Sequence, residues 1–300
     1  MRREWRSRFG ARGVFWRQVL RWAVLNVPVW LEPMAIATWS LFFLFSGAGR
    51  RGVMRNLSVI LPGSSRWMNL LRTYRVFWNF AWTMSDTVRF NELRTVPDWE
   101  FEGLEYFEEL SAHVGGAIVL TAHLGSYDLG AHLFAEVCGR TLTMVRAPEE
   151  EESTQEWESR MRARSQAAGV RVGFSTSNLA FDLLAAIQRG EIVAIQGDRT
   201  TKGVASVAAR MFGEKTMLPS GPFALAMAAR VPIYPLFVVR RGRRRYRLMT
   251  AQPFEVRRTT ADRDRDLEAA VVRWTATLES VLRESWDQWF AFEPFAEAGS

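Results

Sequence analysis

From residue 49 onward, short apolar runs alternate with longer amphipathic stretches. Several of the runs are apolar at nearly every position, which is typical of strands covered on both faces of a sheet. The stretches between them have the spacing of helices that pack one face on a core. Alternating strands and helices predict an α/β fold, with a central, largely parallel (mixed) sheet flanked by helices. The predicted strands cover residues 117–121, 142–145, 170–174, 192–196, 204–208, 233–240 and 246–250, and the predicted helices cover residues 129–136, 155–168, 179–189 and 221–229.

A helical pattern of apolar positions also predicts a C-terminal helix that faces the core. Its positions are Leu267, Val271, Trp274, Leu278 and Val281. No internal repeat, low-complexity tract or Gly/Ser-rich linker divides residues 49–300, so we expect a single domain there.

Residues 22–48 form a mostly apolar segment that is interrupted at several positions. The interruptions are Asn26, Pro28, Glu32 and Pro33. The longest clean run, residues 34–48, would span about 22 Å as a helix at ~1.5 Å per residue. The hydrocarbon core of a bilayer is about 30 Å thick, so we expect a bent, interfacial or re-entrant membrane-associating helical segment rather than a simple span. The alternative is an amphipathic helix that packs on its own domain.

The chain is basic, and its positive charge is concentrated in arginine. The 39 Lys and Arg exceed the 32 Asp and Glu by 7, and the only lysines are Lys202 and Lys215. Seven arginines lie within residues 1–21, directly before the apolar segment. A cationic arm of this kind predicts adhesion to an anionic membrane leaflet from the cytoplasmic side. We therefore expect two parts, a basic arm with a membrane-associating segment at 1–48 and a globular domain at 49–300.

Composition excludes several classes of protein. With 48% hydrophobic and 24% charged residues the chain is globular, which excludes disordered, collagen-like and coiled-coil proteins. The single cysteine, Cys138, excludes an intramolecular disulfide framework and a multi-cysteine metal site. A basic surplus also suits nucleic acid, but the sequence contains no recognisable nucleic-acid-binding module.

The most informative segment, residues 117–130, joins an apolar strand to a helix. His123 follows the strand, Gly125 and Ser126 lie in a turn, and Asp128 begins the helix. On one regular helix the histidine and the aspartate would point about 140° apart, so they meet only if the chain bends between them. A strand–turn–helix junction supplies that bend, and ligands usually bind at the carboxyl ends of strands in α/β sheets. His123 is therefore predicted to remove a proton while Asp128 orients its imidazole.

The other two histidines do not add to this pair. His113 lies in a predicted loop and His132 inside a predicted helix, which favours structural roles for both. A metal site built on His123, Asp128 and Asp198 would need a further ligand, so no metal is predicted.

The run His123-Leu-Gly-Ser-Tyr-Asp128 resembles the His-x4-Asp/Glu motif of the lysophospholipid and glycerolipid acyltransferase superfamily. The branch that the chain most resembles is the bacterial lipid A biosynthesis (lauroyl/myristoyl) acyltransferase family. Six further segments between residues 50 and 295 are similar to segments of that family and follow in the same order. They are Val145-Arg-Ala-Pro148, Arg160-Met-Arg-Ala-Arg164, Leu183 to Glu191 with Ile195-Gln-Gly-Asp-Arg199, Phe212-Gly213 with Leu218-Pro-Ser-Gly-Pro222, Val231-Pro-Ile-Tyr-Pro235, and Trp286-Asp-Gln-Trp289 with Phe292-Glu-Pro294.

Three residues of the motif depart from the lipid A branch. Asp128 replaces the more common Glu, Tyr127 replaces Trp or Phe, and Ser126 replaces Asn. These differences leave the reaction class intact and leave the acceptor open, so neither lipid A nor an acyl chain length is predicted.

The resemblance implies a glycerolipid-acyltransferase-like fold and a membrane-associated O-acyltransferase. Such an enzyme moves a fatty acyl group from an acyl thioester, acyl-ACP or acyl-CoA, to a hydroxyl of a lipid or glycolipid acceptor. The thioester brings its own leaving group, so no cofactor is expected. The implied location is the cytoplasmic face of the bacterial inner (plasma) membrane, with peripheral or monotopic attachment, and residues 49–300 would form the catalytic domain.

The resemblance makes His123 the general base and Asp128 its orienting group. Backbone N–H groups near Gly125 and Ser126, or a nearby arginine, would hold the oxyanion. The candidates for binding the acceptor are Arg146, Arg164, Asp198 and Arg199, with Arg160 or Arg162 in place of Arg164 if the helical register differs. Arginine suits a phosphorylated or acidic head group, whereas Asp198 could equally hold an arginine in place.

Two questions stay open at this point: the role of the arginines after residue 239 and whether the protein is an enzyme. The arginines at 240, 241 and 243–245 suit a solvated hairpin turn, or contact with lipid phosphates or an acidic acyl carrier protein. The alternatives to an enzyme are a catalytically inactive membrane-surface scaffold with the same fold and a basic nucleic-acid-binding protein.

Overall fold

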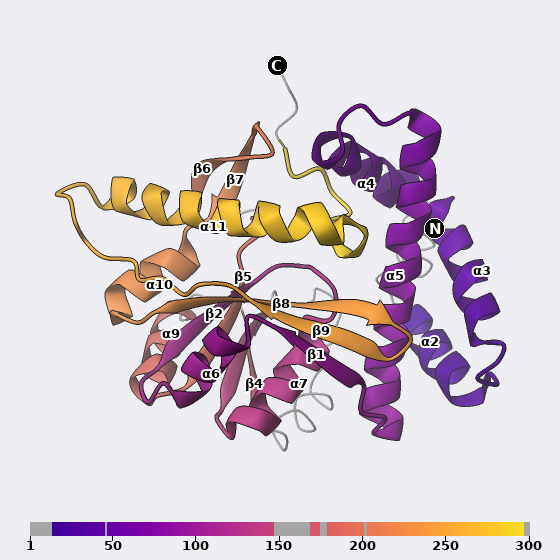
Figure 1. Ribbon diagram of the computed structural model, residues 1–300, viewed down its shortest axis with the longest axis horizontal. Helices are drawn as coiled ribbons and strands as arrows, with labels where there is room; N and C mark the ends of the chain where they lie inside the picture. Colours follow the sequence, from indigo (N-terminus) through magenta and orange to yellow (C-terminus); the bar gives the residue numbers. More distant parts are fainter. Residues whose placement is uncertain (1–13, 46, 147–168, 175–178, 201–202, 297–300) are drawn as a thin grey trace, which may run out of the picture.

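The computed structural model describes residues 14–45, 47–146, 169–174, 179–200 and 203–296 (Figure 1). Its centre is a seven-stranded sheet with the strand order β1-β9-β8-β2-β5-β3-β4. In this sheet β8 and β9 pair antiparallel, and the other five neighbouring pairs are parallel. The predicted α/β fold with a largely parallel, mixed sheet is therefore confirmed. The strands are β1 (Asp98–Glu102), β2 (Ala117–Thr121), β3 (Leu142–Arg146), β4 (Val170–Phe174), β5 (Ile192–Gln196), β8 (Ile233–Gly242) and β9 (Arg245–Thr250).

The apolar pattern places β2, β4 and β5 at their observed bounds. The predicted strand at 204–208 overlaps an observed strand, but it begins too early and does not belong to the central sheet. The structure has β6 (Ser206–Met211), which pairs with β7 (Glu214–Pro219) in a separate two-stranded sheet. Exposed and more buried positions alternate along β6, which is the pattern of an outer hairpin and not of a central strand. The predicted helix at 155–168 lies outside the described residues.

Four described helices precede the sheet and form a layer beside it (Figure 1). They are α2 (Val14–Asn26), α3 (Glu32–Leu44), α4 (Gly47–Ile60) and α5 (Arg66–Leu93). The chain bends between α2 and α3 at residues 27–31, where Pro28 interrupts the apolar segment. Within the described part of the chain, no helix is both long enough and apolar enough to cross a membrane.

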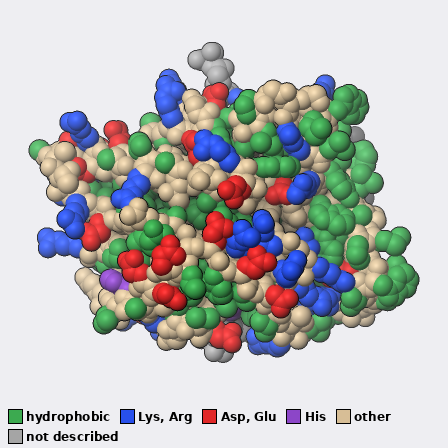
Figure 2. Space-filling view, in the orientation of Figure 1, with side chains coloured by type: hydrophobic (Ala, Val, Ile, Leu, Met, Phe, Trp, Pro, Cys, Tyr) green, Lys and Arg blue, Asp and Glu red, His purple; other side chains and the backbone are tan. Residues whose placement is uncertain are grey.

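The two sides of α3 have different surroundings. Its inner side packs on α5, where Ile36 lies in one cluster with Ala81 and Trp82. Its outer side and the neighbouring part of α2 leave large apolar side chains exposed, on the edge of the molecule that is green at the right of Figure 2. We call these residues the apolar patch: Trp22, Leu25, Val29, Trp30, Met34, Leu41, Phe42 and Phe45. The segment therefore packs on its own domain and also presents an apolar surface.

The arginine-rich turn between β8 and β9 is a hairpin, as predicted, but it is less solvated than predicted. The guanidinium of Arg240 lies over the Trp82 ring, 4.8 Å from the ring centroid, and its side chain is 10% exposed. Arg243 and Arg89 both bond the buried carboxylate of Glu32, at 2.6 and 2.9 Å. The hairpin and α5 thus tie down α3, and loss of Glu32 would leave the buried Arg89 without its counter-ion.

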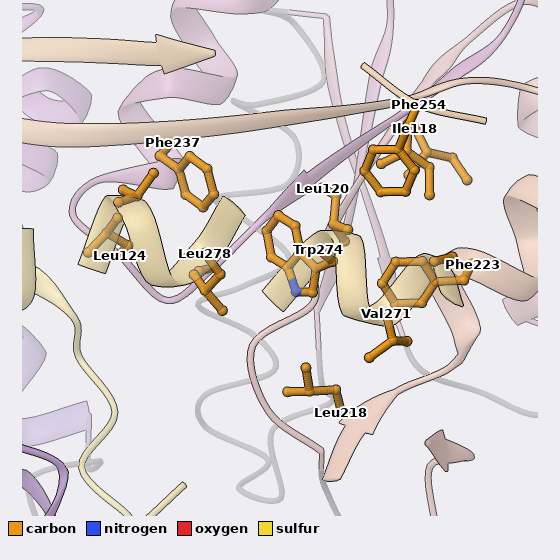
Figure 3. Close-up of a cluster of buried hydrophobic side chains, with 14 of the residues drawn as sticks. Ile118, Leu120, Leu124, Leu218, Phe223, Phe237, Phe254, Val271, Trp274 and Leu278 are labelled. Atoms are coloured by element: carbon orange, nitrogen blue, oxygen red, sulfur yellow. The ribbon is translucent and has the colours of Figure 1, made fainter. Parts of the chain in front are cut away.

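Different helices cover the two faces of the sheet. The helices are α6 (Leu104–Ala112), α7 (Tyr127–Cys138), α9 (Leu179–Gln188), α10 (Gly221–Ala229) and α11 (Arg263–Ser285), followed by the short 3-10 helix η1 (Trp286–Gln288). α6 and α7 pack on one face, and α9, α10 and α11 pack on the other. Figure 3 shows the core beneath α11, where the fully buried Trp274 lies near Leu120 and Leu278. The predicted core-facing stripe of the C-terminal helix is confirmed.

Candidate active site

The turn after β2 places His123 at the carboxyl edge of the sheet. Gly125 adopts a positive φ of 58°, and a Cβ atom there would lie 1.8 Å from the carbonyl oxygen of Val238. Both the backbone conformation and the close approach of β8 therefore require glycine at this position. α7 begins at Tyr127, so the chain turns away from the sheet shortly after Gly125, which still forms a bridge with Val238 of β8.

The imidazole of His123 is bonded to Asp198. Nδ1 of His123 lies 2.8 Å from Oδ1 of Asp198, and the backbone N–H of His123 donates to the same oxygen at 3.1 Å. Asp198 follows β5, the neighbour of β2, which brings together two residues that are distant in sequence. The side chain of His123 is 24% exposed and that of Asp198 is 0% exposed. Nε2 of His123 has no hydrogen-bond partner among the described residues, so it is the nitrogen available to a substrate.

Asp198 is an ionised carboxylate in a fully buried position. Burial, the largest influence, would raise its pKa, but the charge and hydrogen bond of His123, the charge of Arg199 and the indole N–H of Trp289 outweigh it. Together these groups hold the pKa of Asp198 at about 2, below the ordinary value of 3.8. Beside an imidazole, such a carboxylate keeps the proton on Nδ1 and stabilises the imidazolium that forms when Nε2 takes up a proton.

Asp198 occupies the position that the sequence analysis assigns to Asp128. From the sequence we expect Asp198 at the acceptor site or beside an arginine, whereas the structure brings it to the His123 ring. Asp128 lies in the first turn of α7 and is partly buried, and it is not among the described hydrogen-bond partners of the His123 ring. The role of Asp128 toward His123 stays a prediction.

The backbone donors predicted for the oxyanion are already engaged within the protein. The N–H of Gly125 donates to the carbonyl of Gln288 and that of Ser126 to the carbonyl of Val238, both at 2.9 Å. The Ser126 side chain is buried, with its hydroxyl 3.5 Å from the Thr87 hydroxyl. Gly125 and Ser126 therefore shape the turn, and an oxyanion role for N–H groups near them stays a prediction.

The arginines predicted for the acceptor site have different positions. Arg199 directly follows Asp198 and is partly buried, and its charge helps to keep that carboxylate ionised. Arg146 ends β3, at the same carboxyl edge as His123 and two strands from β2 in the sheet order. Arg164, like its substitutes at 160 and 162, lies outside the described residues.

An apolar cavity lies between α7 and the sheet, on the strands that lead to His123 and Asp198, although neither of these two residues lines it. It holds about 480 Å³ of space, part of which is open to solvent. Thr121 lies two residues before His123 and Gln196 two residues before Asp198, and both line the cavity. Tyr127 also lines it, with its ring centroid 6.4 Å from that of His123. The other lining residues are Val119, Gly130, Ala131, Phe134, Leu142, Met144, Val145, Ala194 and Leu236.

Three members of this site, Thr121, Gln196 and Trp289, are not identified by the sequence analysis as site residues. Nε2 of Gln196 is buried without a hydrogen-bond partner among the described residues, and its polarity at the end of an apolar strand is a signal that could have identified it. The indole N–H of Trp289 donates to Oδ2 of Asp198 at 2.8 Å across 91 residues, a separation that no local spacing rule covers.

The comparison with protein families agrees with the motifs of the sequence. The family described as bacterial lipid A biosynthesis acyltransferase matches the chain over residues 1–294, which is nearly its whole length. No curated protein matches the chain.

Proposed function

The chain belongs to the bacterial lipid A biosynthesis acyltransferase family, and on this premise we propose that it moves a fatty acyl group from acyl-ACP or acyl-CoA to a hydroxyl of a lipid or glycolipid. Acyltransferase activity on a lipid follows from the family itself. The donor, the acceptor hydroxyl and the residues that act are the proposed part. The observation that carries it is the partly exposed His123, with a buried carboxylate behind it, at the end of a strand whose residues Val119 and Thr121 line an apolar cavity.

In the proposed reaction, Nε2 of His123 accepts the proton of the acceptor hydroxyl while the hydroxyl oxygen attacks the thioester carbonyl. A C–O ester bond forms, the C–S bond breaks, and the imidazolium returns its proton to the leaving thiolate. Asp198 holds the Nδ1–H bond, so the lone pair needed for this step is on Nε2. Since the thioester supplies its own leaving group, the proposed reaction uses no cofactor.

Because the N–H groups of Gly125 and Ser126 are bonded within the protein, we propose further donors for the negative charge that develops on the carbonyl oxygen. We assign this role to Arg199 and to the unpartnered amide of Gln196, which lies two residues before Asp198 in the cavity lining. Arg146 is kept as a candidate for the acceptor head group because of its place at the carboxyl edge of the sheet.

The apolar cavity beneath α7 is the proposed site of the fatty acyl chain. Its lining is mostly aliphatic and aromatic, and its polar residues Thr121 and Gln196 lie close in sequence to the catalytic pair. A thioester carbonyl at this polar end would place the chain among the apolar residues farther along the strands. Each buried methylene contributes about 0.8 kcal/mol, so the length of this cavity would set the preferred chain.

Ala131→Leu should shorten the preferred acyl chain. Ala131 is buried on α7 and lines the cavity, so the added carbons would occupy space needed by methylene groups of the donor. At about 0.8 kcal/mol per methylene, loss of two methylene contacts would lower kcat/KM for the longest donor roughly tenfold or more and change shorter donors little. The measurement is kcat/KM for a series of saturated acyl-CoA or acyl-ACP donors.

The matched control is Ala135→Leu, one turn farther along α7, where the alanine is buried but does not line the cavity. This variant should lower the melting temperature without changing which acyl chain length gives the highest kcat/KM. An identical donor preference in the two variants would contradict the placement of the chain in this cavity.

Members of this family are membrane-associated in bacteria. We propose that this chain binds the cytoplasmic face of the bacterial inner membrane through the apolar patch of α2 and α3, as a peripheral or monotopic protein. Tryptophan and phenylalanine favour the interface between lipid and water, and the arginines beside the patch would attract anionic head groups. In this proposal residues 1–48 form the membrane-associating part and residues 49–300 the catalytic domain.

Replacing Trp30, Met34 and Phe45 together with serine should release the protein from membranes. These side chains are 74%, 65% and 74% exposed, so little internal packing is lost. Each would lose about 1.5–3 kcal/mol of burial in lipid, and binding to vesicles that contain phosphatidylglycerol should weaken at least about 100-fold. Vesicle sedimentation of the full chain is the measurement, because removal of residues 1–48 would also remove the Glu32 counter-ion of the buried Arg89.

The control for this variant replaces Val114 and Phe181 with serine. These side chains are 94% and 75% exposed and lie outside the apolar patch. The control should sediment with vesicles like the wild type, and equal release of the two variants would exclude the patch as the binding surface.

The proposed function is tested by incubating the full-length protein with acyl-ACP or acyl-CoA and bacterial membrane lipids. We expect release of free thiol and a lipid whose mass has increased by one acyl group. Mass spectrometry of cellular lipids with and without the protein would then identify the acceptor. Vesicle binding without any acyl transfer from either donor would instead indicate a membrane-surface scaffold.

A further inference from the structure

We infer that Trp289 is a positioning residue for the reaction, which acts through the hydrogen bond from its indole N–H to Asp198. The inference rests on the proposed function, in which Asp198 orients the base His123. It adds a residue from the C-terminal segment, far in sequence from the motif that carries the chemistry.

The two oxygens of Asp198 have different donors. Oδ1 accepts both bonds from His123, the Nδ1–H bond at 2.8 Å and the backbone N–H bond at 3.1 Å. Oδ2 accepts the indole N–H of Trp289 at 2.8 Å, which is its one hydrogen bond with the described residues. His123 therefore fixes one oxygen and Trp289 the other, and together they set the plane of the carboxylate. Without the indole N–H, Oδ2 would lose its donor, and only the two bonds from His123 to Oδ1 would restrain rotation of the carboxylate about its Cβ–Cγ bond.

Trp289 is itself held firmly, as a positioning residue must be. It is buried, and its ring packs against that of Phe295 with centroids 5.4 Å apart. The residues on either side of it bond the turn that carries His123. The carbonyl of Gln288 accepts the N–H of Gly125 at 2.9 Å, and the N–H of Phe290 donates to the carbonyl of His123 at 2.8 Å. One short segment thus fixes the backbone of the base and the carboxylate of its partner.

The electrostatics of the pair support the same role. Among the largest influences on the pKa of Asp198 are the charges of His123 and Arg199, and Trp289 adds a neutral donor that also lowers this pKa. Without that donor the ionised form would be less stable in a site closed to water. The buried carboxylate would then protonate at a higher pH, and while ionised it would hold the imidazolium more tightly. The second effect moves the acidic limb of the pH–rate profile to higher pH, whereas the carboxylate, with a pKa of about 2 in the wild type, stays ionised over that range.

The variant Trp289→Phe removes the N–H group and keeps an aromatic ring. Because hydrogen bonds to charged groups are among the stronger ones, we expect kcat to fall roughly tenfold or more with little change in KM. The acidic limb of the profile of kcat/KM against pH should move upward by about one unit. A purely structural loss would lower the melting temperature and leave this limb in place.

Trp274→Phe is the matched control. The indole N–H of Trp274 donates at 2.8 Å to the carbonyl of Gly197, the residue next to Asp198, and the ring is fully buried. Its acceptor is a neutral carbonyl, so the control should lose stability without moving the acidic limb. An unmoved limb in Trp289→Phe, or an equal movement in both variants, would overturn the inference.

A measurement on the wild-type protein covers the case in which Trp289→Phe does not fold. In nitrogen-15 NMR spectra, the indole N–H signal of Trp289 should shift as the active-site pair titrates, and this response should vanish in His123→Ala. The absence of any indole signal that titrates with the pair would overturn the inference.

Failure of the inference and failure of the proposed function give different results. The function stands and the role of Trp289 fails if the wild type is active, His123→Ala is inactive and Trp289→Phe has the same kcat and pH profile as the wild type. If the wild type transfers no acyl group, the proposed function itself fails.

Discussion

Replacing His123 with alanine should lower kcat for acyl transfer by about 10²- to 10⁴-fold, the usual contribution of a general base. The imidazole supplies a basic nitrogen, Nε2, that has no hydrogen-bond partner among the described residues, and the alanine side chain offers no base in its place. Rates with purified full-length protein, an acyl thioester and a lipid acceptor are the measurement. Normal turnover of this variant would exclude His123 as the base.

The fold should survive the substitution with some loss of stability. Asp198 would lose the Nδ1–H bond but would keep the indole N–H of Trp289 and the nearby charge of Arg199. The matched control is His113→Ala. His113 precedes β2 at the opposite end of that strand, and its Nε2 lies 3.3 Å from the carbonyl oxygen of Gly116. This variant should keep kcat close to the wild-type value and should bind vesicles normally.

The strands that carry the site could be predicted because burial on both faces leaves a clear sequence pattern. β2 and β5 are short apolar runs, and β2 is buried at every position. The position of His123 directly after such a run also indicated its chemistry, since the carboxyl ends of parallel strands share one edge of the sheet. Both inferences use neighbouring residues alone, which is why they could be made without knowing the strand order.

The carboxylate partner of His123 could not be predicted in this way. The parallel register pairs Thr121 with Gln196, and two residues beyond each of these lie His123 and Asp198. Their contact therefore depends on β2 and β5 being neighbours, and a pattern of apolar positions does not specify strand order. Sequence spacing favoured Asp128 because it lies close to His123 along the chain, whereas the sheet brings in a residue 75 positions away.

Elements with mixed faces also escaped the sequence analysis. β1 alternates charged residues with Trp99 and Phe101 at the edge of the sheet, which gives a weak strand signal. α5 buries polar side chains such as Asn69, Thr73 and Asn79 against other helices and η1. A helix with polar residues on its packed side has no clean amphipathic stripe, and its burial comes from tertiary contacts.

Asp198→Asn should lower kcat by about 10²-fold or more, although the side chain keeps its size. Three N–H donors face the two oxygens of Asp198, two from His123 and one from Trp289. An asparagine offers one acceptor oxygen, so its NH₂ group must face one side. If the NH₂ group faces His123, it donates to Nδ1 and favours the imidazole tautomer with the proton on Nε2. In that tautomer Nε2 has no free lone pair and cannot act as a base. If the NH₂ group instead faces Trp289, it lies against the indole N–H, and two donors without an acceptor in a buried site lower the stability of the fold.

Asp128→Asn decides between the two carboxylates when its kcat is compared with that of Asp198→Asn in the same assay. Since Asp198 bonds Nδ1 at 2.8 Å, we expect the smaller loss in Asp128→Asn. The carboxylate of Asp128 lies in the first turn of α7, where the positive end of the helix dipole stabilises a negative charge. The Asp128→Asn variant should therefore lose some stability by this effect. A loss of kcat in Asp128→Asn as large as that in Asp198→Asn would mean that both carboxylates act on His123. A larger loss would return the orienting role to Asp128 and leave Asp198 as a structural contact of the turn.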